Sequence, residues 1–214
     1  TSWFHMKILF CNYEYPPLGG GGGVVNAMLA EELSKQHEVT VLTSSGFELP
    51  DEEVVNGVKI VRVPVYVRTE QAAANFPSMA AYMINGIKYG KKLMQTQQFD
   101  IINTHFALPT GPVGHALAKH SGLPNVLSVH GGDLYDPSKF TSPHRHWLLR
   151  TWVKSLLRNA DAIVGQSNNT NENVGKFYDP NFDTKLIPLG IHRPQYTEKS
   201  RADLGLSDDD IVLS

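Results

Sequence analysis

The sequence lacks several features that would assign it to a special class of protein. It has a single cysteine, Cys11, which excludes an internal disulfide framework and fits a reducing compartment. No apolar run approaches the roughly 20 residues that a membrane-spanning helix needs. There is also no basic start followed by an apolar stretch, as in a signal peptide. These absences predict a cytoplasmic protein.

An excess of charge of one sign is absent as well. Nineteen basic and twenty-one acidic residues give a net charge of -2, so overall charge indicates no nucleic-acid partner. Nine histidines are present, but there is no H-E-x-x-H motif. The pairs His115/His120 and His144/His146 do not have the four-residue spacing of metal ligands on one helical face. We therefore expect neither a metal nor a cofactor.

What is present is a regular alternation of strand-length apolar runs with helical patterns. This predicts an α/β fold, a Rossmann-like parallel sheet of six or seven strands with helices on both faces. The predicted strands lie at 7–11, 38–43, 58–65, 99–106, 124–132, 161–167 and 185–191, and the predicted helices at 24–35, 77–97, 110–120, 143–159 and 169–178. The pair Asn56-Gly57 predicts a tight turn before the third strand.

The two ends of the chain differ from this pattern. We interpret residues 1–5, which precede Met6, as a fusion remnant, and residues 6–193 as one Rossmann-like domain. Residues 194–214 are polar and then end in an apolar "IVLS". We expect them to be a linker and the first strand of a second domain.

Ligands of such sheets bind beyond the carboxyl ends of the strands. That rule selects the glycine run, His105, the block His130 to Asp133, and Ser167, which each follow a different predicted strand. We expect these positions to surround one crevice.

The glycine run, Gly19, Gly20, Gly21, Gly22 and Gly23, lies between the first strand and the first helix. Free backbone N–H groups at a helix start attract phosphate. The dinucleotide pattern G-x-G-x-x-G would place its third glycine at Val24, and no P-loop lysine follows. We therefore predict proximity to a phosphate or sugar, with a flexible solvent loop as the alternative.

His130 closes an apolar run and is followed by Gly131, Gly132 and Asp133. An imidazole can donate a hydrogen bond to a bound or developing oxygen near neutral pH. We predict a functional role for His130, with core packing as the alternative. His105 has the same kind of position with fewer polar neighbours, and both interpretations of it stay open.

The segment "GQSNN" at 165–169 resembles a nucleophile elbow but has Asn169 in place of the last glycine. We prefer the interpretation that Ser167 or a neighbouring asparagine caps the following helix.

The predicted helix at 143–158 carries His146, Arg150, Lys154 and Arg158 at four-residue spacing, beside Trp147, Leu148, Trp152 and Leu156. A basic amphipathic helix can contact an anionic membrane from its inner face. The preferred alternative is a helix packed on the sheet with its charged stripe in water.

Five blocks in this order, "MKILFCNYEYPPLGGGGGVV", "FDIINTHF", "SVHGGD", "ADAIVGQSNNTNENV" and "KLIPLGIHRPQY", make the chain similar to the N-terminal domain of a GT-B glycosyltransferase, specifically the retaining family four (group 1 type). The resemblance implies an acceptor-side domain facing a donor-binding second domain. It implies that the glycine loop and Asp133 lie near the diphosphate or sugar of the donor, and that His130 contacts the donor sugar as the catalytic histidine. His105 and Ser167 would lie on the acceptor side.

The resemblance also implies the partners and the chemistry. The donor would be a nucleotide sugar, and the acceptor a glycan, a lipid-linked molecule or a small molecule. Transfer would retain the anomeric configuration, without a metal, with the donor's own phosphate helping to deprotonate the acceptor hydroxyl. The basic pair and paired glutamates that hold the donor in the family are not in this sequence, so the chain alone is expected to be inactive. A non-catalytic nucleotide- or sugar-binding module and a dinucleotide binder remain alternatives.

Overall fold

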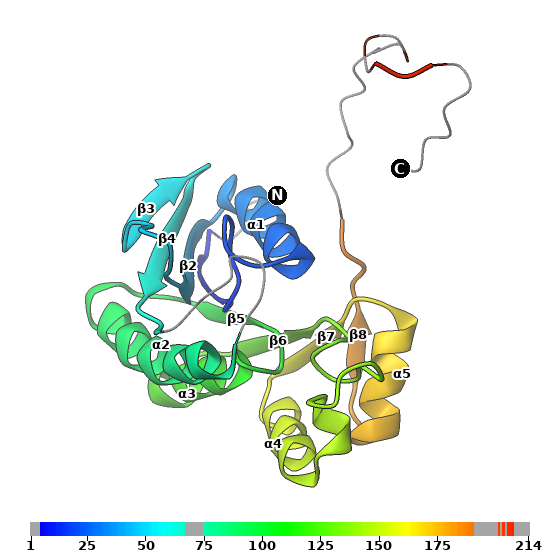
Figure 1. Cartoon of the computed structure of the whole chain (residues 1–214). Coiled ribbons are helices and arrows are strands. Elements are labelled where there is room, and N and C mark those ends of the chain that lie inside the picture. Colours follow the sequence, from blue (N-terminus) through cyan, green and yellow to red (C-terminus); the bar gives the residue numbers. More distant parts are fainter. Residues whose placement is uncertain (1–4, 67–74, 191–200, 202, 204, 208–214) are drawn as a thin grey trace.

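The centre of the molecule is an eight-stranded sheet in the order β3-β4-β2-β1-β5-β6-β7-β8 (Figure 1). The computed structural model describes residues 5–66, 75–190, 201, 203 and 205–207. Its strands are β1 (Lys7–Cys11), β2 (Glu38–Ser44), β3 (Glu52–Val55), β4 (Val58–Val63), β5 (Ile101–His105), β6 (Asn125–Val129), β7 (Ala162–Gly165) and β8 (Thr184–Leu186). Every neighbouring pair is parallel except β3 with β4. The predicted Rossmann-like α/β fold is thereby confirmed.

Helices follow the strands at nearly the predicted positions. They are α1 (Gly21–Ser34), α2 (Phe76–Thr96), α3 (Gly111–Ser121), α4 (Trp147–Arg158) and α5 (Asn168–Phe177), with a 3-10 turn at Pro143–Arg145 before α4. The predicted helix at 143–159 is therefore two pieces, because His146 between them has an extended backbone. None of the described helices is both long and apolar enough to cross a bilayer.

The edge strand β3 was missed by the sequence analysis. Its four residues, "EEVV", pair antiparallel with β4 and are largely exposed, so they lack the alternation that marks a half-buried strand. The predicted turn at Asn56-Gly57 is confirmed as the tip of this hairpin, since both residues have positive φ, 49° and 83°. That conformation is typical of a two-residue hairpin turn.

The helices lie on both faces of the sheet, but unequally. The faces of β1, β5 and β6 that carry Leu9, Ile102 and Leu127 are covered by α2 to α5, which supply apolar partners such as Leu117 and Leu156. The opposite face carries Phe10, and among the described helices only α1 covers it, beside β1, β2 and β4. On that face, β5, β6 and β7 are therefore not covered by a described helix, and they border a groove.

The face of α1 that packs on the sheet is not the large apolar one. The helix buries Gly23, Asn26, Ala27 and Ala30, whereas Val24 and Leu29 are 46% and 37% exposed. Small residues let the helix approach the strands closely. The larger apolar side chains are left to line the groove beside the helix.

The predicted division of the chain falls mostly outside the described part. Residues 1–4 and nearly all of 191–214 are not described. The fusion remnant, the domain boundary at 193 and the strand of a second domain therefore stay predictions.

Candidate functional site

The glycine run and His130 both contact one aromatic ring, that of Phe106. A β-carbon on Gly22 would lie 2.3 Å from Phe106 Cζ, so this glycine lets the ring pack against the start of α1. The Phe106 and His130 rings are stacked, with centroids 4.1 Å apart and planes at 23°. The loops after β1, β5 and β6 thus meet at the carboxyl edge of the sheet, as the sequence predicted.

His130 is held by two nitrogen atoms that approach the same ring atom. Its Nε2 lies 3.0 Å from His105 Nδ1 and 3.1 Å from Gln166 Nε2. With the Gln166 amide in this orientation its N–H donates, which assigns Nε2 of His130 as the acceptor and places its proton on Nδ1. His105 then donates from Nδ1.

This assignment leaves the acceptor nitrogen Nε2 of His105 buried and without a hydrogen-bond partner among the described residues. If the Gln166 amide were reversed, its oxygen would accept from His130 Nε2, and His105 Nδ1 would have to accept as well. The proton of His105 would then be on Nε2, as a buried N–H without an acceptor. Buried N–H groups without an acceptor are rarer in proteins than buried acceptors without a donor. This favours the orientation in which the Gln166 N–H donates to His130. Gln166 was not selected from the sequence, although its place at the end of β7 was a usable signal.

Both histidines are neutral near pH 7. Burial lowers the pKa of His130 to about 4. Burial, and then the neighbouring His130, lower the pKa of His105 well below its usual value. His130 can therefore donate a hydrogen bond from Nδ1 but does not carry a positive charge at neutral pH.

Asp133 connects the loops after β5 and β6. Its Oδ2 accepts the N–H of Ala107 at 2.6 Å, and its Oδ1 accepts the N–H of His130 at 2.9 Å. Burial raises the pKa of this carboxyl, and the backbone N–H groups oppose that rise. Both oxygens are thus used inside the protein, and direct contact of Asp133 with a donor stays a prediction.

The five glycines divide into two groups. Gly19 has φ +99°, and a β-carbon there would lie 2.5 Å from Glu14 Cβ, while one on Gly23 would lie 3.3 Å from the Leu18 carbonyl oxygen. Gly20 and Gly21 have open space instead. Packing and backbone conformation explain Gly19, Gly22 and Gly23, but not Gly20 and Gly21.

The start of α1 presents backbone N–H groups to this open space. The N–H of Gly20 donates to Glu14 Oε2 at 3.0 Å. Within the described ranges, the N–H groups of Gly21 and Gly22 have no acceptor. Such groups at a helix N-terminus suit an anion, and phosphate contact by the glycine run stays a prediction.

Ser167 has the capping role that the sequence analysis preferred. Its Oγ accepts the N–H of Thr170 at 3.1 Å and lies 3.0 Å from the Thr170 hydroxyl. It is the N-cap of α5. A place for Ser167 on the acceptor side stays a prediction.

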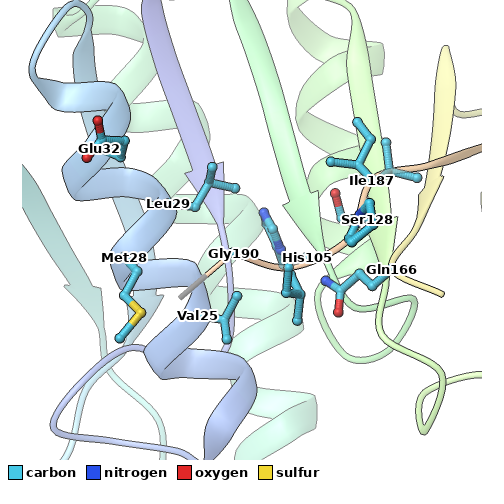
Figure 2. A pocket seen from close by; sticks show the side chains of 12 residues that line it. Val25, Met28, Leu29, Glu32, His105, Ser128, Gln166, Ile187 and Gly190 are labelled. Carbon is cyan, nitrogen blue, oxygen red and sulfur yellow. The ribbon is translucent and has the colours of Figure 1, made fainter. Parts of the chain in front are cut away.

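A groove of about 310 Å³ opens beside His105. Figure 2 shows Val25, Met28 and Leu29 of α1 on one side and His105, Ser128 and Gln166 on the other. The chain from Ile187 to Gly190 closes part of it. The apolar side chains of α1 thus form one wall of this groove. Among the described residues, no group of three His, Cys, Asp or Glu side chains could hold a metal ion.

Residues 19–193 match the family model described as Glycosyltransferase Family 4. The chain belongs to this family. It is 32% identical over 227 residues to an uncharacterized glycosyltransferase of Methanocaldococcus jannaschii, a match that covers 97% of the chain and 54% of the relative. A putative teichuronic acid biosynthesis glycosyltransferase of Bacillus subtilis is 24% identical, with 95% of the chain and 56% of the relative covered.

The fold comparison agrees with the family. Sucrose-phosphate synthase of Thermosynechococcus elongatus superimposes with a TM-score of 0.77 at 19% identity, over 96% of this chain and 54% of that one. The domain therefore has the Rossmann-like GT-B fold. The family 4 chain spans about half the length of these two relatives and of this synthase.

Proposed function

We propose that the chain is the acceptor-side domain of a retaining glycosyltransferase, which transfers a sugar from a nucleotide-sugar donor to an acceptor hydroxyl. The observation that carries the proposal is His130. Its Nε2 lies 3.0 Å from His105 Nδ1 and 3.1 Å from Gln166 Nε2, and burial keeps the ring neutral near pH 7. The ring stacks on Phe106, which also contacts the start of α1 in this family 4 chain. The acceptor is a glycan, a lipid-linked molecule or a small molecule, and the enzyme works in the cytoplasm.

Each group has a chemical task in this proposal. The N–H groups of Gly21 and Gly22, with the positive end of the α1 dipole, attract the donor diphosphate as negative charge grows on it during transfer. His130 donates from Nδ1 to an oxygen of the donor sugar and orients it. A donor phosphate oxygen takes the proton of the acceptor hydroxyl, so no metal is required.

We further propose that this chain transfers no sugar by itself. The base, the ribose and most of the diphosphate would be bound by the part of the protein that lies outside it. Positioning of two substrates contributes roughly 7–11 kcal/mol of barrier lowering, and one side of a cleft does not supply it.

The test uses the longer protein of which, in this proposal, the chain is one domain, with a panel of nucleotide sugars and acceptors. We expect His130→Ala to lower kcat/KM by about 10²-fold, the scale of losing one donor to a reacting group. His120→Ala on the exposed end of α3 is the matched control and should keep the parent value. Near-normal turnover by the His130→Ala protein would contradict the proposal. Nucleotide binding without any turnover would instead support a non-catalytic module, and uptake of NAD a dinucleotide binder.

A further inference from the structure

Four large apolar side chains are exposed at the start of α4 and in the loop before it. The exposed fractions are 75% for Phe140, 70% for Trp147, 62% for Leu148 and 40% for Trp152. We call these four residues the α4 apolar face. The helix packs on the core through other residues, Val153, Leu156 and Leu157, and Figure 1 shows α4 at an outer edge of the domain. The residues of the α4 apolar face are thus not needed to pack the helix on the core.

The backbone that carries these side chains is held in place. His146 Nε2 lies 2.7 Å from the carbonyl oxygen of Phe140, to which it can donate, and the two rings meet edge to face at 5.3 Å. His146 directly precedes α4, so the loop is fastened to the helix start. Leu148 and Trp152 are four residues apart and share one side of the helix. The backbone that carries the four side chains is therefore fixed.

Basic residues are interspersed along the chain with those of the α4 apolar face. Residues 137–158 contain Lys139, Arg145, Arg150, Lys154 and Arg158, and no aspartate or glutamate. Asp136 pairs with Lys139, and Asp179 pairs with Lys154 and Arg158. No carboxylate in the described part of the chain forms an ion pair with Arg145 or Arg150. This segment is therefore basic in a chain whose net charge is -2.

We propose that the α4 apolar face and its basic residues bind the surface of an anionic lipid bilayer. Tryptophan is favoured at the level of the lipid headgroups, and arginine and lysine are attracted to anionic lipid. A second copy of the chain fits less well, because a two-fold contact would place Arg145 and Arg150 opposite like charges. From the sequence, a helix packed on the sheet with its charged stripe in water was the preferred interpretation. The packing is confirmed, but the exposed tryptophans now favour the membrane.

The surface is separate from His130, and its lipid binding does not depend on the proposed function. Because α4 follows β6, it begins at the carboxyl edge of the sheet, where His130 also lies. A membrane bound there would lie beside the crevice. That placement suits a lipid-linked acceptor, a point that rests on the proposed function.

The experiment is sedimentation of the chain with vesicles of phosphatidylcholine alone or mixed with phosphatidylglycerol. We expect binding only to the anionic vesicles at about 0.05 M salt and loss of binding at about 0.5 M salt. Arg145→Gln and Arg150→Gln should each lower the partition coefficient by roughly fivefold. In a Trp3→Phe background the two remaining tryptophans should show a blue-shifted emission on binding. Trp147→Ser/Trp152→Ser should bind far less.

The matched control is on α2, where Phe76 and Ile84 are 66% and 69% exposed. Phe76→Ser/Ile84→Ser should bind as the parent does. The proposal is overturned if neither the chain nor the longer protein binds anionic vesicles, or if the α2 variant loses binding and the α4 variant does not. A dimer in sedimentation velocity that Trp147→Ser/Trp152→Ser abolishes would assign the face to a second copy. The two glutamine variants, at exposed positions, keep the test valid if the serine variant does not fold.

Discussion

His130 combines a hydrogen-bonding role with a buried, neutral ring, and this combination has a cost at acidic pH. In the folded chain its pKa is about 4, whereas an unfolded histidine has a pKa near 6.5. Between these values the unfolded state binds more protons than the folded state. The stability that the neutral ring contributes is therefore present above about pH 6.5 and is lost as the pH falls toward 4.

We predict that His130→Gln weakens this pH dependence. The glutamine carbonyl can accept from His105 and Gln166 but does not titrate. Between pH 7 and about pH 4.5 the parent should lose up to roughly 3 kcal/mol more stability than the variant, which follows from the shift in pKa. Urea unfolding of the 214-residue chain at both pH values is the measurement. Parallel pH curves for the two proteins would show that His130 is not the group that titrates.

At the scale of single elements, α3 lies unusually close to β5 through Gly114. A β-carbon on this residue would lie 1.8 Å from Thr104 Oγ1, and that hydroxyl donates to Asn125 Oδ1 at 2.6 Å. The close approach fixes the position of α3 against the strand that ends in His105. A larger residue would push the helix and strand apart.

We predict that Gly114→Ala destabilises the chain by about 1–3 kcal/mol, the usual cost of overpacking a core. Gly175 on α5 is the matched control, because a β-carbon there meets only ordinary contact, 3.8 Å from Pro180 Cα. Gly175→Ala should stabilise the chain by up to about 1 kcal/mol, since alanine favours a helix. Thermal or urea unfolding measures the change in stability of each variant. If Gly114→Ala and Gly175→Ala changed the free energy of unfolding in the same direction, the packing explanation would be wrong.

The whole molecule is a sheet with its own core on both faces. Apolar clusters lie between α2 to α5 and the sheet and between α1 and the sheet. A chain of this size buries enough surface to be stable alone. Among the described residues, by contrast, the groups proposed to face the donor are the α1 N-terminus and His130.

We predict that the purified chain unfolds cooperatively in urea, yet shows no sugar transfer with a panel of nucleotide sugars. Contacts at an exposed helix N-terminus are each worth about 0.3–1 kcal/mol, so nucleotide binding should be weak. The longer protein is the control and should be active with at least one donor. Turnover by the chain near the rate of the longer protein would show that the donor site lies within these 214 residues.

The sequence by itself determined the class of fold and several local features. Strand-length runs alternating with helical patterns predicted the order of the elements, because side-chain periodicity is a property of neighbouring residues. The turn at Asn56-Gly57 and the cap at Ser167 were predictable for the same reason, since each depends on a few adjacent residues. The strand-end rule also selected His105 and His130, which do lie in contact.

Only the tertiary structure decided how these parts are used. It showed that His105 and Gln166 both approach Nε2 of His130. It also placed the Phe106 ring against both Gly22 and His130 and left Trp147 exposed. It also showed that α1 packs through small residues and that β3 extends the sheet. These outcomes depend on contacts between segments far apart in the chain, and such contacts leave no periodic signal in the sequence. The physical reason is that burial and hydrogen bonding are decided by which surfaces meet after the strands have paired.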